Sequence, residues 1–377
     1  RPPRSTLFPY TTLFRSTGAM FSSGFFLLPG IAASYTGDSV YLAYLLAGFL
    51  IIPAMLCMAE LSTAMPKAGG TYYFLDRALG PLFGTIGGLG SWVAVVFKSA
   101  FALVGMGAYL SLYLDVPILV LAVILTLVFG LINAVGAKET TFLQRLLVAT
   151  LVVILAAYVI LGLAHTGVAV GLRPNADRQP FFTSGTVGFV ATIGLVFVSY
   201  AGLTKVASVA EEVQSPDRNI PLGMVLSLLT ATAIYTLGLI VIIAILPIET
   251  LYGSLTPVAD AGRQFIGDWP FDLGVILIVV AAIAAFASTG NAGIMSASRY
   301  PYAMAKDKLL PDRFAVIGRC GTPVFSIAVT TFSMIAVLLL FNVEAVAKLA
   351  SAFQLFLFGL VSVAVIVMRE SRIATYK

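Results

Sequence analysis

Long apolar stretches separated by short polar loops fill almost the whole chain. A helix that crosses a bilayer core of about 30 Å needs about 20 apolar residues. Apolar and polar positions do not alternate, so helices rather than a barrel are expected to satisfy the backbone. We therefore predict an all-α membrane protein with ten transmembrane helices, at residues 16–37, 39–59, 78–97, 116–137, 146–164, 179–204, 219–248, 273–298, 320–343 and 349–368.

Composition supports the membrane assignment and narrows the chemistry. Apolar residues make up 59% of the chain and charged residues 10%, whereas a soluble domain carries about 25% charged residues. Cys57 lies in an apolar stretch, Cys320 lies in a polar loop, and the chain has one histidine, so neither a disulfide framework nor a metal site is expected. An enzyme would need clustered acids, histidines or metal ligands inside the spans, where only Lys98 stands. We predict that the chain is not an enzyme and needs no cofactor.

Charge in the loops sets the orientation. The net charge of +5 could indicate a nucleic-acid partner, but the basic residues lie in short loops between apolar stretches. With the start of the first span inside, 14 Lys and Arg residues lie in inside loops and three, Arg173, Arg178 and Arg263, lie outside. The lipid bilayer is therefore the expected partner, with no nucleic acid and with a cytoplasmic N-terminus. A prokaryotic inner or plasma membrane is the expected location, and the sequence indicates no oligomeric state.

Residues 1–16 differ from the rest of the chain. The stretch TLFPYTTLFRS at 6–16 looks like a translated DNA-sequencing adapter. A targeting signal is the alternative, but three prolines and the lack of an apolar core argue against it. We expect a non-native leader over 1–16 and a transporter domain over 17–377 whose first helix is incomplete.

Two apolar stretches are interrupted by glycine and serine near their middles. Residues 18–30 read GAMFSSGFFLLPG and residues 194–205 read GLVFVSYAGLTK, and each stretch opens a group of five spans. Small residues also allow close packing of membrane helices, which is the alternative interpretation. Broken helices at matching positions of two halves indicate a transporter binding site, because unwound peptide groups can bind charged ligands. A channel would need rings of charge or a repeated filter, and the sequence contains neither.

Four segments carry a family resemblance. They are the GAM and SGFFLLPG stretches of the first helix, ELS at 60–62 with PKAGGTY at 66–72, YAG at 200–202 with EEVQSPDRNIP at 211–221, and Asn291 with SR at 298–299, YAMAKD at 302–307 and LP at 310–311. In this order over residues 17–377 they resemble the amino acid permeases of the amino acid–polyamine–organocation (APC) superfamily.

This resemblance implies a fold and an activity. The fold is the LeuT-type arrangement of two inverted five-helix repeats, here about 17–166 and 180–377, with substrate between helices 1, 3, 6 and 8. Family members usually have two further helices that this chain lacks. The implied function is secondary active transport of amino acids or related amines by alternating access, proton-coupled or by exchange. A sodium-coupled symporter of the same fold, or a channel, is the alternative.

The resemblance also implies the substrate site. Ser22, Ser23 and Gly24 are expected to offer N–H groups and a hydroxyl to the substrate carboxylate. The family usually has glycine where Ser22 stands, so an added Cβ narrows the approach here. The α-ammonium is expected to contact carbonyl groups of the second broken stretch, at Val198, Ser199, Ala201 and Gly202.

Coupling is expected to involve Lys98 or a hydroxyl pair. Lys98 stands in the middle of the third span, which continues past it to about residue 112, and a cation at that depth is costly unless it is paired or faces water. Snorkelling is the alternative, but both boundaries are distant. Some relatives use a lysine on helix 5, where this chain has Leu151. Ser288 and Thr289 resemble a sodium-binding pair, although such hydroxyls often bond to their own helix.

Three acidic residues lie at the inner ends of helices. Glu60 ends the second span, and Glu211 and Glu212 follow the sixth. They could relay protons, but ion pairs with inside Arg or Lys residues that close an inner gate are the favoured interpretation.

Overall fold

A computed structural model describes residues 20–65, 70–136, 141–166, 181–203, 215–267 and 269–371 of the 377-residue chain. Every regular element in these ranges is helical. The longer helices are α3 (Leu28–Thr36), α4 (Val40–Leu50), α5 (Ile52–Ala64), α6 (Gly70–Leu79), α7 (Pro81–Leu110), α8 (Ile118–Val135), α9 (Thr141–Thr166), α10 (Gly185–Val196), α11 (Pro216–Ile245), α13 (Pro257–Ile266), α14 (Leu273–Lys306), α15 (Val324–Leu340) and α16 (Val343–Glu370). The short ones are α2 (Ser23–Phe26), η1 (Gly37–Ser39), α12 (Ile248–Leu251), η3 (Pro270–Asp272) and η4 (Asp312–Ala315).

The ten predicted spans all contain helix. In the described part of the chain, eight helical stretches are long and apolar enough to cross a membrane. One of them, Leu28–Ala64, holds parts of the first two predicted spans, and the chain turns between α3 and α4 at Gly37, whose φ of 69° suits glycine. Division at Gly37 leaves the nine-residue α3 and the helices α4 and α5, and the 17-residue α15 is a shorter apolar helix at the ninth predicted span. The all-α fold class is confirmed.

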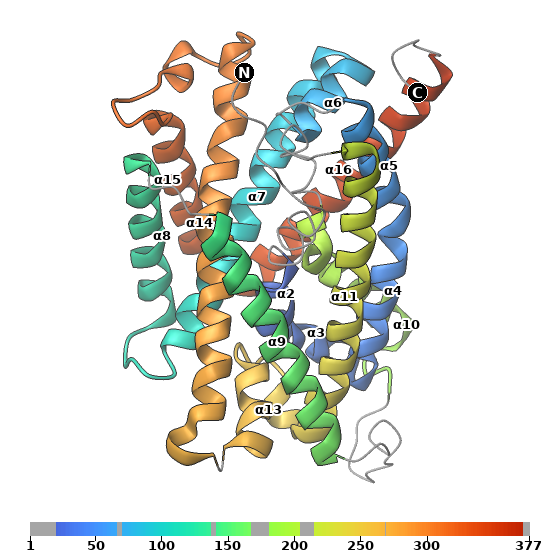
Figure 1. Ribbon diagram of the computed structural model, residues 1–377, viewed down its shortest axis with the longest axis vertical. Helices are drawn as coiled ribbons and strands as arrows, with labels where there is room; N and C mark the ends of the chain where they lie inside the picture. Colours follow the sequence, from blue (N-terminus) through green and yellow to red (C-terminus); the bar gives the residue numbers. More distant parts are fainter. Residues whose placement is uncertain are drawn as a thin grey trace.

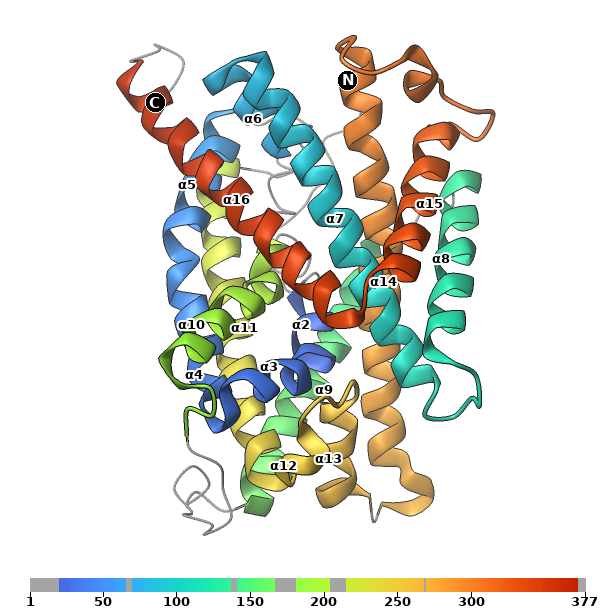
Figure 2. The same cartoon turned by 180° about the vertical axis from the view of Figure 1, so that it is seen from behind.

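Helices that correspond in the two halves of the chain pack against each other. α3 contacts α10, α4 and α5 contact α11, α7 contacts α14, and α8 contacts α15. Figures 1 and 2 show the last pair side by side at one edge of the molecule. The exact limits of the two repeats, like the leader over 1–16, stay predictions, and the leader lies outside the described residues.

Helices α7 and α14 pack more closely than the other pairs. A Cβ added to Gly293 would lie 1.8 Å from Ser99 Oγ, and one added to Gly105 would lie 2.4 Å from the ring of Phe286. Small residues let membrane helices approach until their backbones nearly touch. These two helices therefore form a closely packed frame beside the broken segments.

Basic residues concentrate at one end of the molecule. α6 and the C-terminal ends of α14 and α16 lie at the top of Figure 1, and α13 lies at the bottom. The first three elements carry Arg77, Lys306 and Arg369 there, whereas α13 carries Arg263. The predicted charge asymmetry therefore runs along the length of the molecule.

Candidate functional site

The first broken segment unwinds twice within a few residues. Residues 21–22 form a turn before the four-residue α2, and Leu27 separates α2 from α3. Ser22 has φ −143° and ψ −115°, far from helical values. Pro29, in the first turn of α3, has no N–H to donate to the carbonyl of Phe25. The sequence itself therefore favours a break here.

The second broken segment follows α10. That helix ends at Val196, and residues 197–203 have the tighter 3₁₀ geometry. The hydroxyl of Ser351, on α16, donates to the carbonyl of Leu195 at 2.5 Å and accepts from the N–H of Val198 at 3.1 Å. Sequence reasoning did not identify Ser351, because a serine within an apolar helix has no signature of such a contact.

The two broken segments meet at Gly24 and Ser199. Ser199 Oγ lies 3.5 Å from the carbonyl oxygen of Gly24, and a Cβ added to Gly24 would lie 2.6 Å from Ser199 Cβ. Only glycine allows this approach at position 24. The structure therefore brings together the residues that the sequence assigned to opposite ends of a zwitterion.

Tyrosine hydroxyls bind the carbonyl groups that the first break exposes. Three tyrosines from three helices donate to them: Tyr44 to Gly24 at 2.7 Å, Tyr109 to Phe26 at 2.9 Å and Tyr235 to Met20 at 2.6 Å. The Tyr235 hydroxyl also lies 3.3 Å from the carbonyl of Ser199, so it touches both broken segments. A buried carbonyl without a partner is costly, and these bonds remove that cost. The tyrosines were not predicted, since in sequence they look like ordinary lining residues.

Two hydroxyls at predicted site positions remain without a hydrogen bond to any described residue. Ser22 Oγ and Thr289 Oγ1 are both buried and make none. A buried hydroxyl usually has a partner, so these two are available to a ligand. Ser288, beside Thr289 on α14, is half-buried. The remaining predicted substrate residues, Ser23, Val198, Ala201 and Gly202, are all buried at the two breaks.

Lys98 lies inside the protein on α7, with 8% of its surface exposed. It stands 11 residues before Tyr109, which is about three helical turns, so the two side chains leave the same face of α7. Because the Tyr109 hydroxyl donates to the carbonyl of Phe26, this side of α7 faces the first broken segment. Lys98 is therefore placed on that face, about 16 Å nearer the start of α7.

Helix α16 is tied to other helices at both ends. At its C-terminal end Arg369 makes two hydrogen bonds to Glu60 of α5, at 2.8 Å and 2.5 Å. At its N-terminal end Lys348 lies 2.6 Å from Glu344 and 2.8 Å from the hydroxyl of Tyr35 of α3, which also bonds Glu344. Glu60 thus has the basic partner that its position suggested. Glu211 and Glu212 lie outside the described residues.

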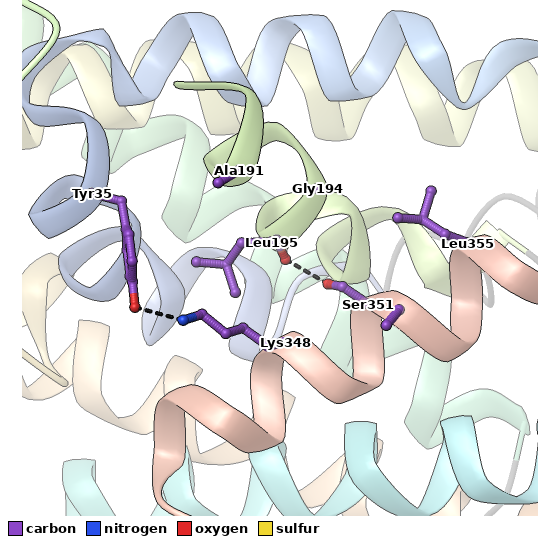
Figure 3. A pocket seen from close by; sticks show the side chains of 8 residues that line it. Tyr35, Ala191, Gly194, Leu195, Lys348, Ser351 and Leu355 are labelled. Carbon is purple, nitrogen blue, oxygen red and sulfur yellow. Dashed lines mark hydrogen bonds between the residues drawn. The ribbon is translucent and has the colours of Figure 1, made fainter. Parts of the chain in front are cut away.

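A pocket of about 320 Å³ lies beside the second break rather than between the two segments. Figure 3 shows Lys348 reaching Tyr35 on one side of it and Ser351 bonded to the carbonyl of Leu195 on another. The remaining lining is apolar or small and consists of Ala191, Gly194, Ala352 and Leu355. No residue assigned to the substrate site from the sequence lines this pocket. Among the described residues, no group of acids, histidines and cysteines could hold a metal ion.

Comparison with known proteins gives the family. The family model described as amino acid permease matches residues 12–375. The chain is 30% identical to cationic amino acid transporter 2, vacuolar, of Arabidopsis thaliana over 93% of its own length and 58% of the relative. It is 27% identical to cationic amino acid transporter 8, vacuolar, of the same plant, over 98% of the chain and 64% of the relative. It is 26% identical to a methylthioribose transporter of Bacillus subtilis (strain 168), over 97% of the chain and 81% of the relative.

The chain thus spans about three fifths of the length of these two plant relatives. The relatives are named transporters, which are not enzymes. The predicted resemblance and the family match agree over nearly the whole chain. The chain belongs to the amino acid permease family of the APC superfamily, and it is an integral membrane protein with that family's all-α LeuT-like fold.

Proposed function

We propose that the protein is a secondary active transporter that moves amino acids or related amines across a membrane by alternating access. The observation that carries this proposal is the meeting of two broken helical segments at Gly24 and Ser199. Unwound peptide groups at the middle of a membrane protein can bind the charged ends of a small molecule. Family membership supports the same activity.

The carboxylate of the substrate binds at the first break in this proposal. N–H groups of Ser23 and Gly24 donate to it, and the Ser22 N–H exchanges its 2.9 Å bond to the Met20 carbonyl for the ligand. The buried Ser22 hydroxyl, which has no described partner, adds one more donor. The Cβ of Ser22 narrows the approach to this site and favours a substrate that is compact next to its carboxylate.

The α-ammonium group binds carbonyl groups of the second break. These belong to Val198, Ser199 and Ala201, and Gly202 lets the chain bend beside them. Tyr235 already donates weakly to the carbonyl of Ser199, at 3.3 Å, so an ammonium group would compete with this hydroxyl for the same oxygen. Substrate binding would therefore loosen the contact of Tyr235 with the second segment while its shorter bond to Met20 remains.

Alternating access requires contacts that open and close at the two ends of the protein. The Arg369–Glu60 pair joins α16 to α5 at the end that carries most basic residues, and the group of Tyr35, Glu344 and Lys348 joins α16 to α3 nearer the other end. We assign the first pair to an inner gate. The roles of Glu211 and Glu212 at the same gate stay predictions.

Coupling to protons, or exchange of one substrate for another, is the mode we propose. Lys98 is buried on the face of α7 that looks toward the first break, where a change of its protonation would alter the charge near the substrate path. Sodium coupling is the second candidate, and the unpartnered hydroxyl of Thr289 beside Ser288 favours it. We place the protein in a prokaryotic inner or plasma membrane with a cytoplasmic N-terminus.

Uptake into liposomes tests the function. The reconstituted protein is given labelled L-leucine, L-arginine, L-glutamate and putrescine, with and without Na⁺ and with and without a pH gradient. We expect saturable uptake of at least one amino acid or amine, independent of Na⁺, and its loss in Lys98→Met. Uptake that requires Na⁺ and is lost in Thr289→Ala would favour the sodium mode. Unsaturable flux of all probes would overturn the transporter proposal in favour of a channel.

A further inference from the structure

The second break contains backbone groups that bond to another helix. α10 ends at Val196, and the chain continues with 3₁₀ geometry from residue 197. An α-turn joins groups four residues apart and a 3₁₀ turn joins groups three apart, so backbone bonding changes at this point. Here the Leu195 carbonyl accepts from the hydroxyl of Ser351, and the Val198 N–H donates to the same hydroxyl.

The hydroxyl of Ser351 bridges two backbone groups at the change from α to 3₁₀ geometry. It donates to the Leu195 oxygen at 2.5 Å and accepts from the Val198 nitrogen at 3.1 Å, and its side chain is 2% exposed. A side chain that inserts into the hydrogen-bond ladder of a helix bends or breaks the helix at that point. The sequence GLVFVSYAG at 194–202 has no proline that would break the helix by itself.

The position of Ser351 along α16 is fixed by contacts on either side of it. Lys348, one turn earlier, is bonded to Tyr35 of α3. Phe358, about two turns later, packs edge-on against Phe197, with ring centroids 5.8 Å apart. The hydroxyl is therefore held in register with the break by contacts above and below it.

We propose that Ser351 is a positioning residue for substrate binding, which keeps the second segment broken and thereby directs the carbonyl groups of Val198 and Ser199 toward the ligand. This inference rests on the proposed transport function. Ser351 does not touch the substrate, and it acts through the backbone of 195–198. An alanine at this position removes one bond from the Leu195 carbonyl and one from the Val198 N–H, so the segment 195–198 can shift and carry the carbonyl groups of Val198 and Ser199 with it.

Three variants separate this role from ordinary packing. Ser351→Ala removes the hydroxyl, and Ser351→Cys keeps the size but replaces it with a weak donor. Ser351→Thr restores a hydroxyl, and the neighbouring pocket of about 320 Å³ has room for the added methyl group. Ser362→Ala is the matched control, because Ser362 lies on the same helix and donates only to the carbonyl of Phe358 in its own preceding turn.

Initial rates of uptake of L-leucine and L-arginine into liposomes, over a range of concentrations, give KM and Vmax for each variant. We expect Ser351→Ala to raise KM about tenfold with Vmax within about twofold, since a lost buried hydrogen bond changes affinity by about this factor. Ser351→Cys should be intermediate, and Ser351→Thr and Ser362→Ala should lie within about twofold of the wild type.

The outcomes are distinct. If the wild type shows no saturable uptake of any amino acid or amine, the proposed function fails and this inference fails with it. If the wild type transports but Ser351→Ala keeps its KM, or lowers Vmax alone, the inference fails and the function stands. If Ser351→Ala does not fold, a wild-type KM in Ser351→Cys overturns the inference, whereas a raised KM that Ser351→Thr restores supports it.

Discussion

The two breaks differ in what creates them. The first break is encoded locally, because Gly24 permits a close approach and Pro29 removes a donor from its own ladder. The second break is bridged by a distant residue, Ser351, whose hydroxyl bonds both the Leu195 carbonyl and the Val198 N–H. The comparison teaches that the first break has a cause in its own sequence, while the second break is bonded to α16 and can respond to movement of that helix.

The largest effect is expected where the two breaks touch. Gly24→Ala places a Cβ 2.6 Å from Ser199 Cβ, and because both sides are buried the segments must move apart. We expect initial uptake rates to fall about a hundredfold, since a displacement of about 1 Å in a binding site can have that effect. Gly194→Ala is the control, because nothing lies within 4 Å of a Cβ there. Equal activity in both variants would contradict the close contact at Gly24.

Removal of the hydroxyl that touches both breaks should have the next largest effect. Tyr235→Phe removes the 2.6 Å bond to the carbonyl of Met20, which still accepts from the N–H of Ser22 at 2.9 Å, so the free energy of unfolding should fall by about 1 kcal/mol. We expect thermal unfolding at lower temperature and an uptake rate reduced about tenfold. The control is Tyr113→Phe, at a position 57% exposed. Unchanged melting of Tyr235→Phe would show that this hydroxyl does not hold the segments together.

A local change tests whether the first break is encoded by its own sequence. Pro29→Ala restores an N–H that can donate to the carbonyl of Phe25, so the segment should become more helical. We expect uptake to fall about threefold while the melting temperature changes little, because the regained hydrogen bond offsets the greater entropy of the unfolded chain. Pro53→Ala, in the first turn of α5, is the matched control. Full activity in Pro29→Ala would mean that the first break is held by tertiary contacts alone.

The smallest effect on stability is expected at the end of α16. Arg369 and Glu60 have side chains 66% and 28% exposed, and such pairs contribute less than about 1 kcal/mol. Arg369→Gln should therefore leave the melting temperature nearly unchanged but alter KM for uptake about twofold if the pair is a gate. Glu60→Gln and the double variant complete a cycle, and Lys308→Gln in the exposed pair with Asp312 is the control. Additive effects in the cycle would argue against coupling across the pair.

The sequence contained enough information for the helices and for the first break. Membrane spans are long, continuous and uncharged, so the length of each uncharged stretch locates them. Glycine and proline indicate the interruption near Gly24. The predicted boundary between the first two spans falls at Asp38, and the structure has its turn there, in η1.

The contacts that hold the candidate site were beyond sequence reasoning. Tyr44, Tyr109 and Tyr235 come from three helices and reach the first segment only after the bundle has formed. Ser351 lies 153 residues from Val198 along the chain, so no local pattern could join them. Hydroxyls in membrane helices usually bond to their own preceding turn, as Ser362 does, and that default hides the exceptions.

The crossing of α7 and α14 has a consequence for engineering new substrate preferences. At Gly105 an added methyl group would lie 2.4 Å from the ring of Phe286, and at Gly293 it would lie 2.7 Å from Ser99 Cβ, so enlargement there displaces the opposite helix. Combinatorial libraries that vary the ligand-facing residues should leave these two glycines unchanged. Diversity is better introduced at open positions such as Gly194 and Gly359, where an added Cβ meets nothing within 4 Å.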